Sequence, residues 1–282
     1  MKTINKIALL LFAIIVGQIS YAQNETKQMR GTSYLPEAGS YAIGADATPV
    51  FNFIGNMFNG TTNNQFDLSS PLIYAKYYLS DITALRTVLG VNSISDHQLF
   101  YVNDDAAHLA NPLSNAQVTD MRVDKINGYY LSLGLQKFIG QKRLRGFYGG
   151  QLFTQYSKNK TDYTYGNPMT ELNPTPTSNF AYNQGERTLS EVSLNDFMFG
   201  AGGIAGFEYY IIPRLCIGGE VSLNIVYSQE MQRYIKTEKM MNDKHIFVDK
   251  AISPGGHELN FKSSSFTPNS FQHVGLYVML HF

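Results

Sequence analysis

The last eleven residues of the chain, from Gln272 to Phe282, constrain its fold most, because they alternate strictly in polarity. In an extended strand, successive side chains point to opposite faces. One face would carry only apolar residues: Val274, Leu276, Val278, Leu280 and Phe282. The other face would carry a mixed set: His273, Gly275, Tyr277, Met279 and His281. An apolar outer face with a mixed inner one is typical of a strand in a membrane-embedded β-barrel.

The N-terminus has the layout of a cleavable secretory signal. Lys2 and Lys6 precede the unbroken apolar run Ile7–Val16, and the small residues Ser20 and Ala22 follow it. The run of ten apolar residues is too short to span a bilayer. A short membrane anchor is the alternative interpretation. We expect cleavage after Ala22, which divides the chain into a signal peptide (1–22), a flexible periplasmic segment (23–39) and a barrel domain (40–282).

Composition excludes several classes of protein. Without Lys2 and Lys6 the chain has 20 basic and 22 acidic residues, a net charge of −2, which gives no footprint for nucleic acid. The single cysteine, Cys216, excludes an internal disulfide scaffold. Beyond the signal, no apolar run reaches 18 residues, so a helical membrane protein is excluded. Since only helices and closed barrels satisfy the backbone inside lipid, a membrane protein of this sequence must be a barrel.

Period-two alternation at membrane-spanning length occurs in eight segments. The sequence therefore predicts an all-β fold, an eight-stranded antiparallel up-and-down transmembrane β-barrel with short periplasmic turns and long extracellular loops. A count of ten strands stays open, and a soluble lipocalin-like barrel, apolar inside and polar outside, is the alternative fold. The expected strands are 40–54, 71–80, 83–95, 125–139, 146–158, 192–211, 214–229 and 270–282, and the expected long loops are 55–70, 96–124, 159–191 and 230–269.

Charged residues within these strands share the parity of the mixed face, so we expect them to point into the lumen. A Lys or Arg facing lipid at mid-depth would cost about 2–4 kcal/mol. An eight-stranded barrel leaves room for side chains but no wide channel. We predict a side-chain-filled lumen; a small porin or channel is the alternative. The predicted polar lumen network is Lys76, Arg86, Gln136, Gln151, Glu208, Glu220 and His273.

Aromatic residues concentrate toward the strand ends, which predicts two girdles at the membrane interfaces. Near the short turns these are Tyr77, Tyr78, Phe138, Phe147, Tyr148, Tyr209, Tyr210 and Phe282. Near the long loops they are Phe51, Phe53, Tyr129, Tyr130, Tyr156, Phe197 and Tyr227.

Several motifs carry a resemblance to a known family. They are the signal peptide, the segment Tyr77–Asp81 before Thr83–Arg86, the segment Gly206–Tyr210 and the terminal Phe282. With them the chain resembles the small outer-membrane β-barrel proteins of the OmpA/OmpX-like superfamily, most closely those of Bacteroidota. The resemblance implies the outer membrane of a Gram-negative bacterium, contact with its lipids and lipopolysaccharide, and insertion by the barrel-assembly machinery, for which the last strand, with Leu280 and Phe282, serves as the signal.

The sequence offers few motifs for catalysis or for binding a cofactor or metal. The motif at Gly200–Ala205 fits a loose dinucleotide pattern but continues as a strand, so we interpret its small residues as packing. No His spacing predicts a metal site, and we expect no cofactor. A lipid A-modifying enzyme, an acyl hydrolase or transferase, is the alternative function, for which Ser222, His273 and Glu220 supply the residue types. We predict a non-enzymatic, monomeric barrel that acts in envelope integrity or binds a surface partner through its long loops.

Overall fold

The structure is a computed structural model, and it describes residues 34–50, 53, 72–140, 142–181, 185–242, 244–263 and 275–282. Residues 34–282 group as one compact unit. The predicted signal peptide (1–22), most of the predicted flexible segment and His273 lie outside the described residues. Among the residues that are described, no helix is both long and apolar enough to cross a membrane.

Eight antiparallel strands close into a ring, as predicted. Going round, β1 pairs with β2, each strand pairs with the next as far as β7, and β11 closes the ring between β7 and β1. Their bounds are β1 (Tyr41–Asp46), β2 (Leu72–Ser80), β3 (Thr83–Asn103), β4 (Gln117–Ile139), β5 (Leu144–Thr164), β6 (Arg187–Ile212), β7 (Leu215–Glu230) and β11 (Gly275–His281). Three tight turns join β2 to β3, β4 to β5 and β6 to β7 at one end.

Side chains alternate between the inside and the outside of the ring. In β11, for example, Tyr277, Met279 and His281 are buried, whereas Leu280 between them is half exposed. The interior combines a cluster of aromatic and apolar residues with buried charges. Small residues make room for this filling: a Cβ at Gly218 would lie 2.3 Å from the Tyr277 ring. The interior therefore differs from the apolar pocket of a lipocalin-like barrel.

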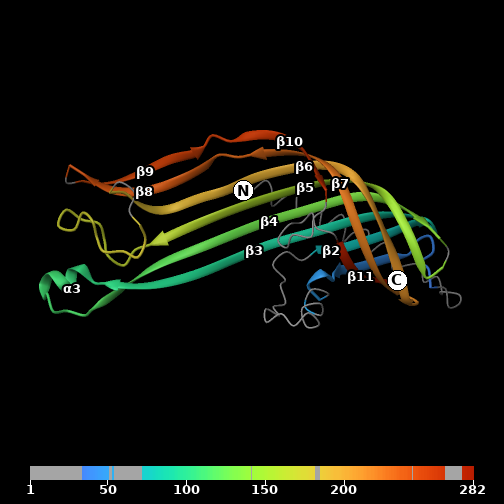
Figure 1. Cartoon of the computed structure of the whole chain (residues 1–282), viewed down its shortest axis with the longest axis horizontal. Coiled ribbons are helices and arrows are strands. Elements are labelled where there is room, and N and C mark those ends of the chain that lie inside the picture. The colour runs from blue at the N-terminus through green and yellow to red at the C-terminus, as the bar shows by residue number, and fades with distance from the viewer. Residues whose placement is uncertain are drawn as a thin grey trace. The chain divides into compact units, whose positions relative to one another are not determined.

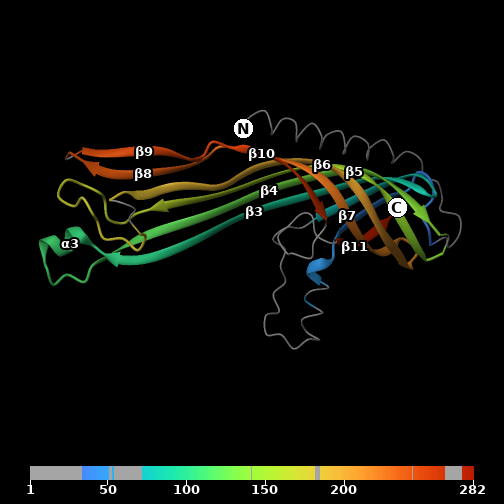
Figure 2. The same cartoon turned by 45° about the horizontal axis from the view of Figure 1, so that its top comes forward.

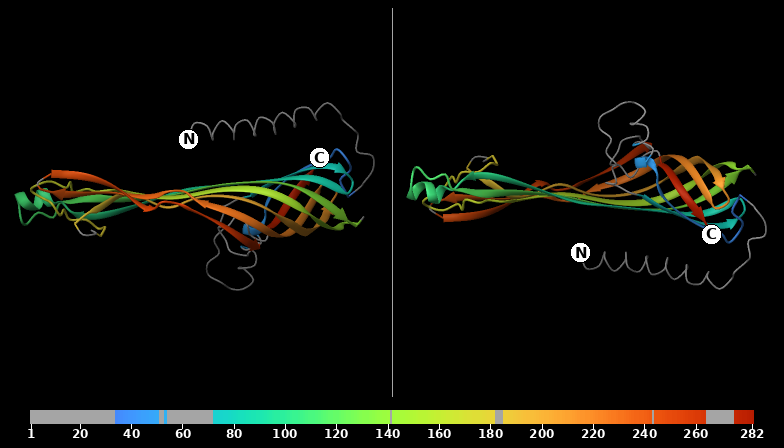
Figure 3. Two further views of the ribbon diagram at one scale, coloured as in Figure 1. Left: turned by 90° about the horizontal axis from the view of Figure 1, so that it is seen from above. Right: turned by 90° about the horizontal axis from the view of Figure 1, so that it is seen from below.

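The expected loop 55–70 lies outside the described residues. The expected loops 96–124 and 230–269 are largely wrong where they are described, because strands continue far past the ring (Figure 1). Within 159–191, strands occupy both ends and a connection remains between Thr164 and Arg187. β3 and β4 stay in register from Thr83↔Lys137 as far as Asn103↔Gln117. A hairpin of β8 (Arg233–Met241) and β9 (Lys244–Ser253) adds to the upper part of β6. We call this continuation, made of the upper parts of β3–β6 with β8 and β9, the sheet extension. Figures 2 and 3 show it running as a narrow twisted sheet away from the ring.

Hydrogen bonds hold the described segments that connect the strands at the far end. A short helix, α3 (Asp105–Ala110), joins β3 to β4, and the Asp104 side chain caps it by accepting from the Ala106 and Ala107 amides. The segment 165–181 after β5 folds back on the sheet. The buried Asp120 accepts from Gly166 N (2.9 Å), Ser178 Oγ (2.6 Å) and Asn179 N (3.0 Å). Both described connections, α3 and the segment 165–181, are thus held by specific hydrogen bonds.

The remaining strand, β10 (Gly256–Ser263), pairs with the upper half of β7. β10 and β11 pair with the same side of β7, β11 with its first half and β10 with its second half. At the opposite end of the ring, contacts begin at Tyr34, six residues before the predicted barrel boundary. The Gly39 amide donates to Tyr78 O (2.7 Å), and the Arg143 guanidinium lies 3.8 Å from the centre of the Tyr34 ring.

Candidate functional site

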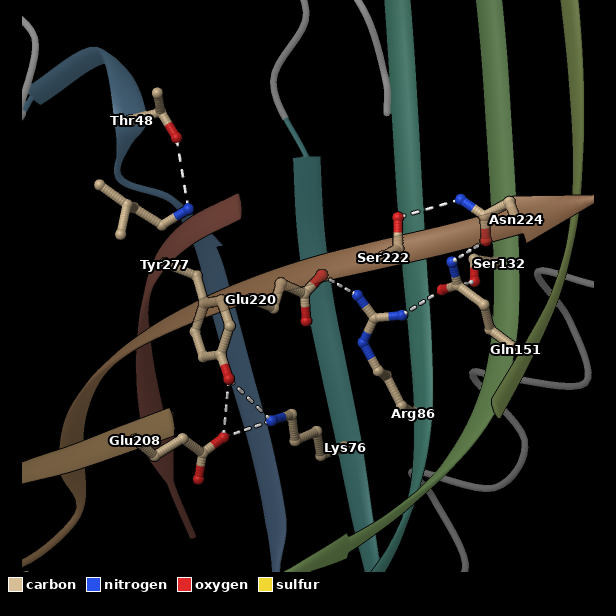
Figure 4. Close-up of polar contacts among 11 residues, drawn as sticks. Thr48, Lys76, Arg86, Ser132, Gln151, Glu208, Glu220, Ser222, Asn224 and Tyr277 are labelled. Atoms are coloured by element: carbon tan, nitrogen blue, oxygen red, sulfur yellow. Dashed lines mark hydrogen bonds and ion pairs between the residues drawn. The ribbon is translucent and has the colours of Figure 1, made fainter. Parts of the chain in front are cut away.

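Two ion pairs cross the inside of the ring, and each joins strands on opposite sides of it (Figure 4). Lys76 on β2 pairs with Glu208 on β6, and Arg86 on β3 pairs with Glu220 on β7. In a ring of eight strands, β2 and β6 are four strands apart, and so are β3 and β7. Both bridges therefore span the diameter of the lumen.

The first bridge sits in an aromatic cage. The Lys76 ammonium lies 4.9 to 5.5 Å from the ring centres of Phe138, Phe147 and Tyr277, within cation–π range. The Glu208 carboxylate also accepts from Tyr277 OH (2.9 Å) and from Tyr210 OH (3.0 Å). Both charged side chains are fully buried. Because a buried charge is tolerated only when it is paired and hydrogen-bonded, the hydroxyls complete the site.

The second bridge belongs to a chain of polar contacts that runs across the ring. Arg86 Nη1 donates to Gln151 Oε1 (2.7 Å), which also accepts from Ser132 Oγ (3.0 Å). Gln151 Nε2 donates in turn to Asn224 Oδ1 (3.1 Å). The contacts come from β3, β4, β5 and β7, so they tie half of the ring together.

The pairing of β2 with β3 places two cations side by side, so each needs a carboxylate of its own. Lys76 and Arg86 are direct cross-strand neighbours in the β2–β3 ladder. Like charges placed opposite each other destabilise a sheet. Each cation reaches across the lumen to its own carboxylate, which offsets that repulsion and leaves the four groups neutral in total.

Of the residues predicted for the lumen, five join these contacts: Lys76, Arg86, Gln151, Glu208 and Glu220. Gln136 is buried, but its amide makes no hydrogen bond within the described part of the chain. His273 lies outside the described residues. Tyr277, Tyr210 and Asn224 also belong to the network but were not among its predicted members, although their parity along the strand places them on the inner face.

Two of the residues proposed for a catalytic site, Glu220 and Ser222, make other contacts. Glu220 is paired with Arg86, and Ser222 Oγ accepts from Asn224 Nδ2 (3.0 Å). Within the described residues, no group of three or more His, Cys, Asp or Glu is placed to hold a metal ion. The single thiol, Cys216, is buried and lies 3.3 Å from His281 Nε2.

The outer surface of the ring is an apolar belt that ends in aromatic residues. Toward the sheet extension, Tyr129, Tyr156 and Phe197 form a continuous row across β4, β5 and β6. The Tyr129 and Tyr156 rings stack with their centres 6.4 Å apart. Toward the short turns the exposed aromatic residues are Tyr77, Tyr148, Phe207, Tyr209 and Phe282. Tyr156 lies eight positions after Tyr148 on β5, which corresponds to about 20 Å of height for a strand tilted by about 40°.

The predicted girdles need correction. Phe51 lies outside the described residues, and five of the proposed girdle residues lie inside the ring instead: Tyr78, Tyr130, Phe138, Phe147 and Tyr210. They have inward parity, so their rings fill the lumen around the charged groups. Nearness to a strand end does not distinguish an inward aromatic residue from an outward one.

A closed antiparallel ring with an ion-paired interior and an apolar belt outside defines a small outer-membrane-type β-barrel. The chain belongs to the putative OmpA-OmpF-like porin family, whose model matches residues 58–247, more than half of its length. It is accordingly an outer-membrane barrel protein, as its resemblance to the OmpA/OmpX-like superfamily predicted.

The solved structure of the outer membrane protein OprG from Pseudomonas aeruginosa matches with 8% identity and a TM-score of 0.35, over 88% of this chain and 98% of that one. At that score no feature of OprG is carried over. No curated protein matches the chain by sequence.

Proposed function

We propose that this protein is a closed, non-enzymatic outer-membrane barrel that anchors the sheet extension outside the cell for binding at the surface. The observation that carries the proposal is the pair of ion bridges across the lumen. With Lys76–Glu208 and Arg86–Glu220 spanning the diameter, and aromatic rings packed between them, the interior is filled with side chains. A filled lumen favours an anchor over a diffusion pore.

The belt supports insertion in the membrane with the short turns in the periplasm. Its outward residues on β4 are Leu131, Leu133 and Leu135, and the Tyr129–Tyr156–Phe197 row marks its upper edge. The sheet extension begins beyond that edge, so this orientation directs it to the cell surface. There the extension, rather than the predicted long loops, offers the area for a ligand or partner. In this proposal Leu280 and Phe282 keep the role in assembly that the resemblance implies.

The orientation can be tested by cysteine labelling on intact cells. Cys216 is fully buried, so the native background is low. Leu172 is 89% exposed in the segment 165–181. We expect Leu172→Cys to react with a membrane-impermeant maleimide on whole cells. Lys142→Cys, at an exposed position beside the β4–β5 turn, should react only after lysis. The reverse pattern would contradict the proposed orientation.

Two measurements test the anchor against its alternatives. The purified protein should produce no discrete conductance steps in a planar bilayer, whereas regular steps would favour the small-channel alternative. Lipid A from a deletion strain should keep its acyl chains unchanged by mass spectrometry. An altered acylation pattern would restore the enzyme alternative, with Ser222 as the first residue to substitute.

A further inference from the structure

On one side, the sheet extension ends in a strand that has a single partner. The strand order of the sheet finishes with β8 and β9, and within the described residues β9 pairs with β8 alone. The free side of an edge strand presents unpaired backbone N–H and C=O groups to any strand that can lie beside it. β9 is ten residues long and contains neither proline nor glycine. It therefore offers a full set of backbone hydrogen bonds to a further strand.

The side chains of β9 also leave contacts unused. Phe247, near the middle of the strand, is 69% exposed. On the same face, the mostly exposed Asp249 lies 3.6 Å from Lys236, and an exposed ion pair of this kind contributes little. Edge strands are usually protected by charges, proline or bulges. An exposed aromatic residue in the middle of β9 is instead what a strand that receives a partner would carry.

A second copy of the same chain is the partner that β9 fits. Two identical edges join as a closed pair about a two-fold axis perpendicular to the sheet, which makes the two strands antiparallel. Such an axis keeps every side chain on its own face of the sheet. Because the faces alternate along a strand, only residues of equal parity become cross-strand partners. This restricts the possible registers to those in which one residue lies on the axis and faces itself.

The register with Phe247 on the axis matches aromatic and charged groups on one face. The Phe247 rings of the two copies lie opposite each other, and aromatic pairs stabilise a sheet. His245 of each copy then lies opposite Asp249 of the other, so an imidazole meets a carboxylate twice. His245 Nε2 contacts Glu238 (2.6 Å), which leaves Nδ1 for the second copy.

The other face is also complementary in this register. Ile246 of each copy lies opposite Val248 of the other, a pair of β-branched residues that suits a sheet. Lys244 would face Lys250, but Glu186 lies 2.5 Å from the Lys250 ammonium and offsets its charge. The neighbouring registers are poorer. An axis at Asp249 opposes two carboxylates, and an axis at Val248 sets Ile246 against Lys250.

The direction of β9 decides which two copies can meet. β9 runs along the length of the extension, away from the ring (Figures 1 and 3). Antiparallel pairing reverses that direction, so the two rings lie at opposite ends of the pair. Copies in one membrane share one orientation and cannot pair in this way. The two rings must therefore lie in two facing membranes.

The contact also lies well outside the bilayer. Phe247 is the cross-strand partner of Glu238, which is that of Arg187 on β6. Arg187 is ten positions from Phe197 of the upper aromatic row. At about 3.3 Å per residue and a tilt of up to about 40°, this places the contact about 25 to 33 Å above the row.

From this geometry we infer that β9 is a homotypic adhesion strand: residues 244–250 pair with the same residues of a second copy in the outer membrane of a facing cell. The inference rests on the orientation given under the proposed function and names the partner of the sheet extension. Seven edge residues bury a small area, so one pair is weak. Many pairs between two surfaces act together and supply the avidity that holds the cells.

The test is clustering of lipid vesicles that carry the full-length protein. Two vesicle populations, labelled with donor and acceptor lipids, are mixed, and energy transfer between them reports contact. Wild-type vesicles should cluster with one another and should not join protein-free vesicles.

Charge exchange at the axis gives the decisive variants. Phe247→Lys sets two ammonium groups against each other and Phe247→Glu sets two carboxylates against each other, so vesicles of either variant alone should not cluster. Mixing the two populations sets an ammonium group against a carboxylate and should restore clustering. A loss of structure would not be reversed by mixing. Leu99→Lys changes an exposed apolar residue on the upper part of β3, at the other side of the extension, and should cluster as the wild type does.

Cross-linking decides if the charged variants fail to refold. Phe247→Cys places thiols opposite each other on the axis, and a short bis-maleimide should link two copies. Ile252→Cys is the matched control on the same strand. The two copies of position 252 would lie ten positions apart along the pair, about 33 Å, so no link should form. The native Cys216 is buried, which keeps the background low.

Each contrary result has one meaning. Wild-type vesicles that do not cluster, or variants that stay apart when mixed, overturn the pairing of β9 with itself. Loss of clustering in Leu99→Lys would overturn it in favour of a contact through β3. Wild-type vesicles that join protein-free ones would show a lipid surface as the partner instead. Since vesicles hold the protein in both orientations, intact clustering with reversed cysteine labelling on cells would contradict only the proposed function.

Discussion

The ring and the sheet extension are built from the same strands, yet different interactions hold them. Within the ring, the ion pairs are buried: the Lys76 and Glu208 side chains are both 0% exposed. In the extension, pairs such as Lys236–Asp249 are 50% and 67% exposed, although Arg187 and Glu238 form one buried pair there, 4% and 6% exposed. The strands β3 to β6 run from the ring into the extension, and their backbone pairing is continuous between the two regions. The single register shift lies between β5 and β6, at Asn159/Lys160.

This difference separates two sources of stability. The ring depends on groups that water cannot reach, so losing one partner leaves a charge stranded. The extension depends on backbone ladders, on buried polar groups such as Asp120 and the Arg187–Glu238 pair, and on exposed pairs at which water can replace a lost partner. We therefore expect substitutions in the ring to act on the whole barrel and substitutions in the extension to act locally.

The largest effect is expected for Glu208→Ala. This change leaves the Lys76 ammonium buried without its carboxylate, which should cost about 3–5 kcal/mol of unfolding free energy. Urea titration in lipid vesicles, followed by far-UV circular dichroism because the chain has no Trp, measures the loss. The double change Lys76→Met/Glu208→Leu removes both charges and should restore most of the stability. Equal losses in the single and double variants would show that packing, not the stranded charge, sets the cost.

A smaller and local effect is expected for Asp120→Ala in the extension. The Asp120 carboxylate accepts three hydrogen bonds from the segment 165–181, and a hydrogen bond to a charged group is worth about 1.5–3 kcal/mol. Hydrogen exchange at Gly166, Asn179 and their neighbours should accelerate, while amides of the ring strands stay protected. Asp96→Ala on the adjacent strand is the matched control, because Asp96 is exposed. Faster exchange throughout the ring would break the separation between the two regions.

The same contrast explains what the sequence could predict. In the ring, lipid outside and side chains inside impose the period-two pattern, so the number of ring strands and the facing of Lys76 and Arg86 could be read directly. Beyond the belt lipid no longer imposes a continuous apolar face, and stretches such as Gln117–Lys125 lose the strict apolar alternation although the backbone ladder continues. The upper strands were therefore mistaken for loops.

The sequence could not predict which charged residues pair inside the ring, and the reason is different. Lys76 and Glu208 are 132 residues apart, and they meet only because the closed ring sets β2 opposite β6. Parity assigns a residue to the lumen but not to a partner. The same limit explains the girdle error, since Tyr78 and Phe138 stack on each other inside the lumen with ring centres 5.7 Å apart.

Acid should weaken the extension around Glu186. Hydrogen bonds from Lys250 and Lys239 lower the pKa of Glu186 to about 2, from an ordinary value near 4.5. A lowered folded-state pKa adds stability that is complete above the unfolded value and is lost as pH falls from about 4.5 toward 2. Hydrogen exchange of β8 and β9, corrected for intrinsic rates, should therefore show weaker protection at pH 3 than at pH 6. Glu186→Gln should remove this difference, and a difference that persists in the variant would show that Glu186 is not its source.

The smallest effect concerns turn strain, which also differs between the two regions. Arg214, after Pro213 in the β6–β7 turn of the ring, has φ of +87°, and Asn242, after β8 in the extension, has φ of +50°. Asparagine tolerates the left-handed region, whereas for other L residues it costs about 1–2 kcal/mol. Arg214→Gly should relieve that strain and keep the backbone bond from His281 N to Arg214 O (2.7 Å). Because glycine also gains freedom in the unfolded chain, we expect a net gain of at most about 1 kcal/mol in urea titration. Asn242→Gly should change little, so equal gains at the two turns would show that the ring stores no more strain than the extension does.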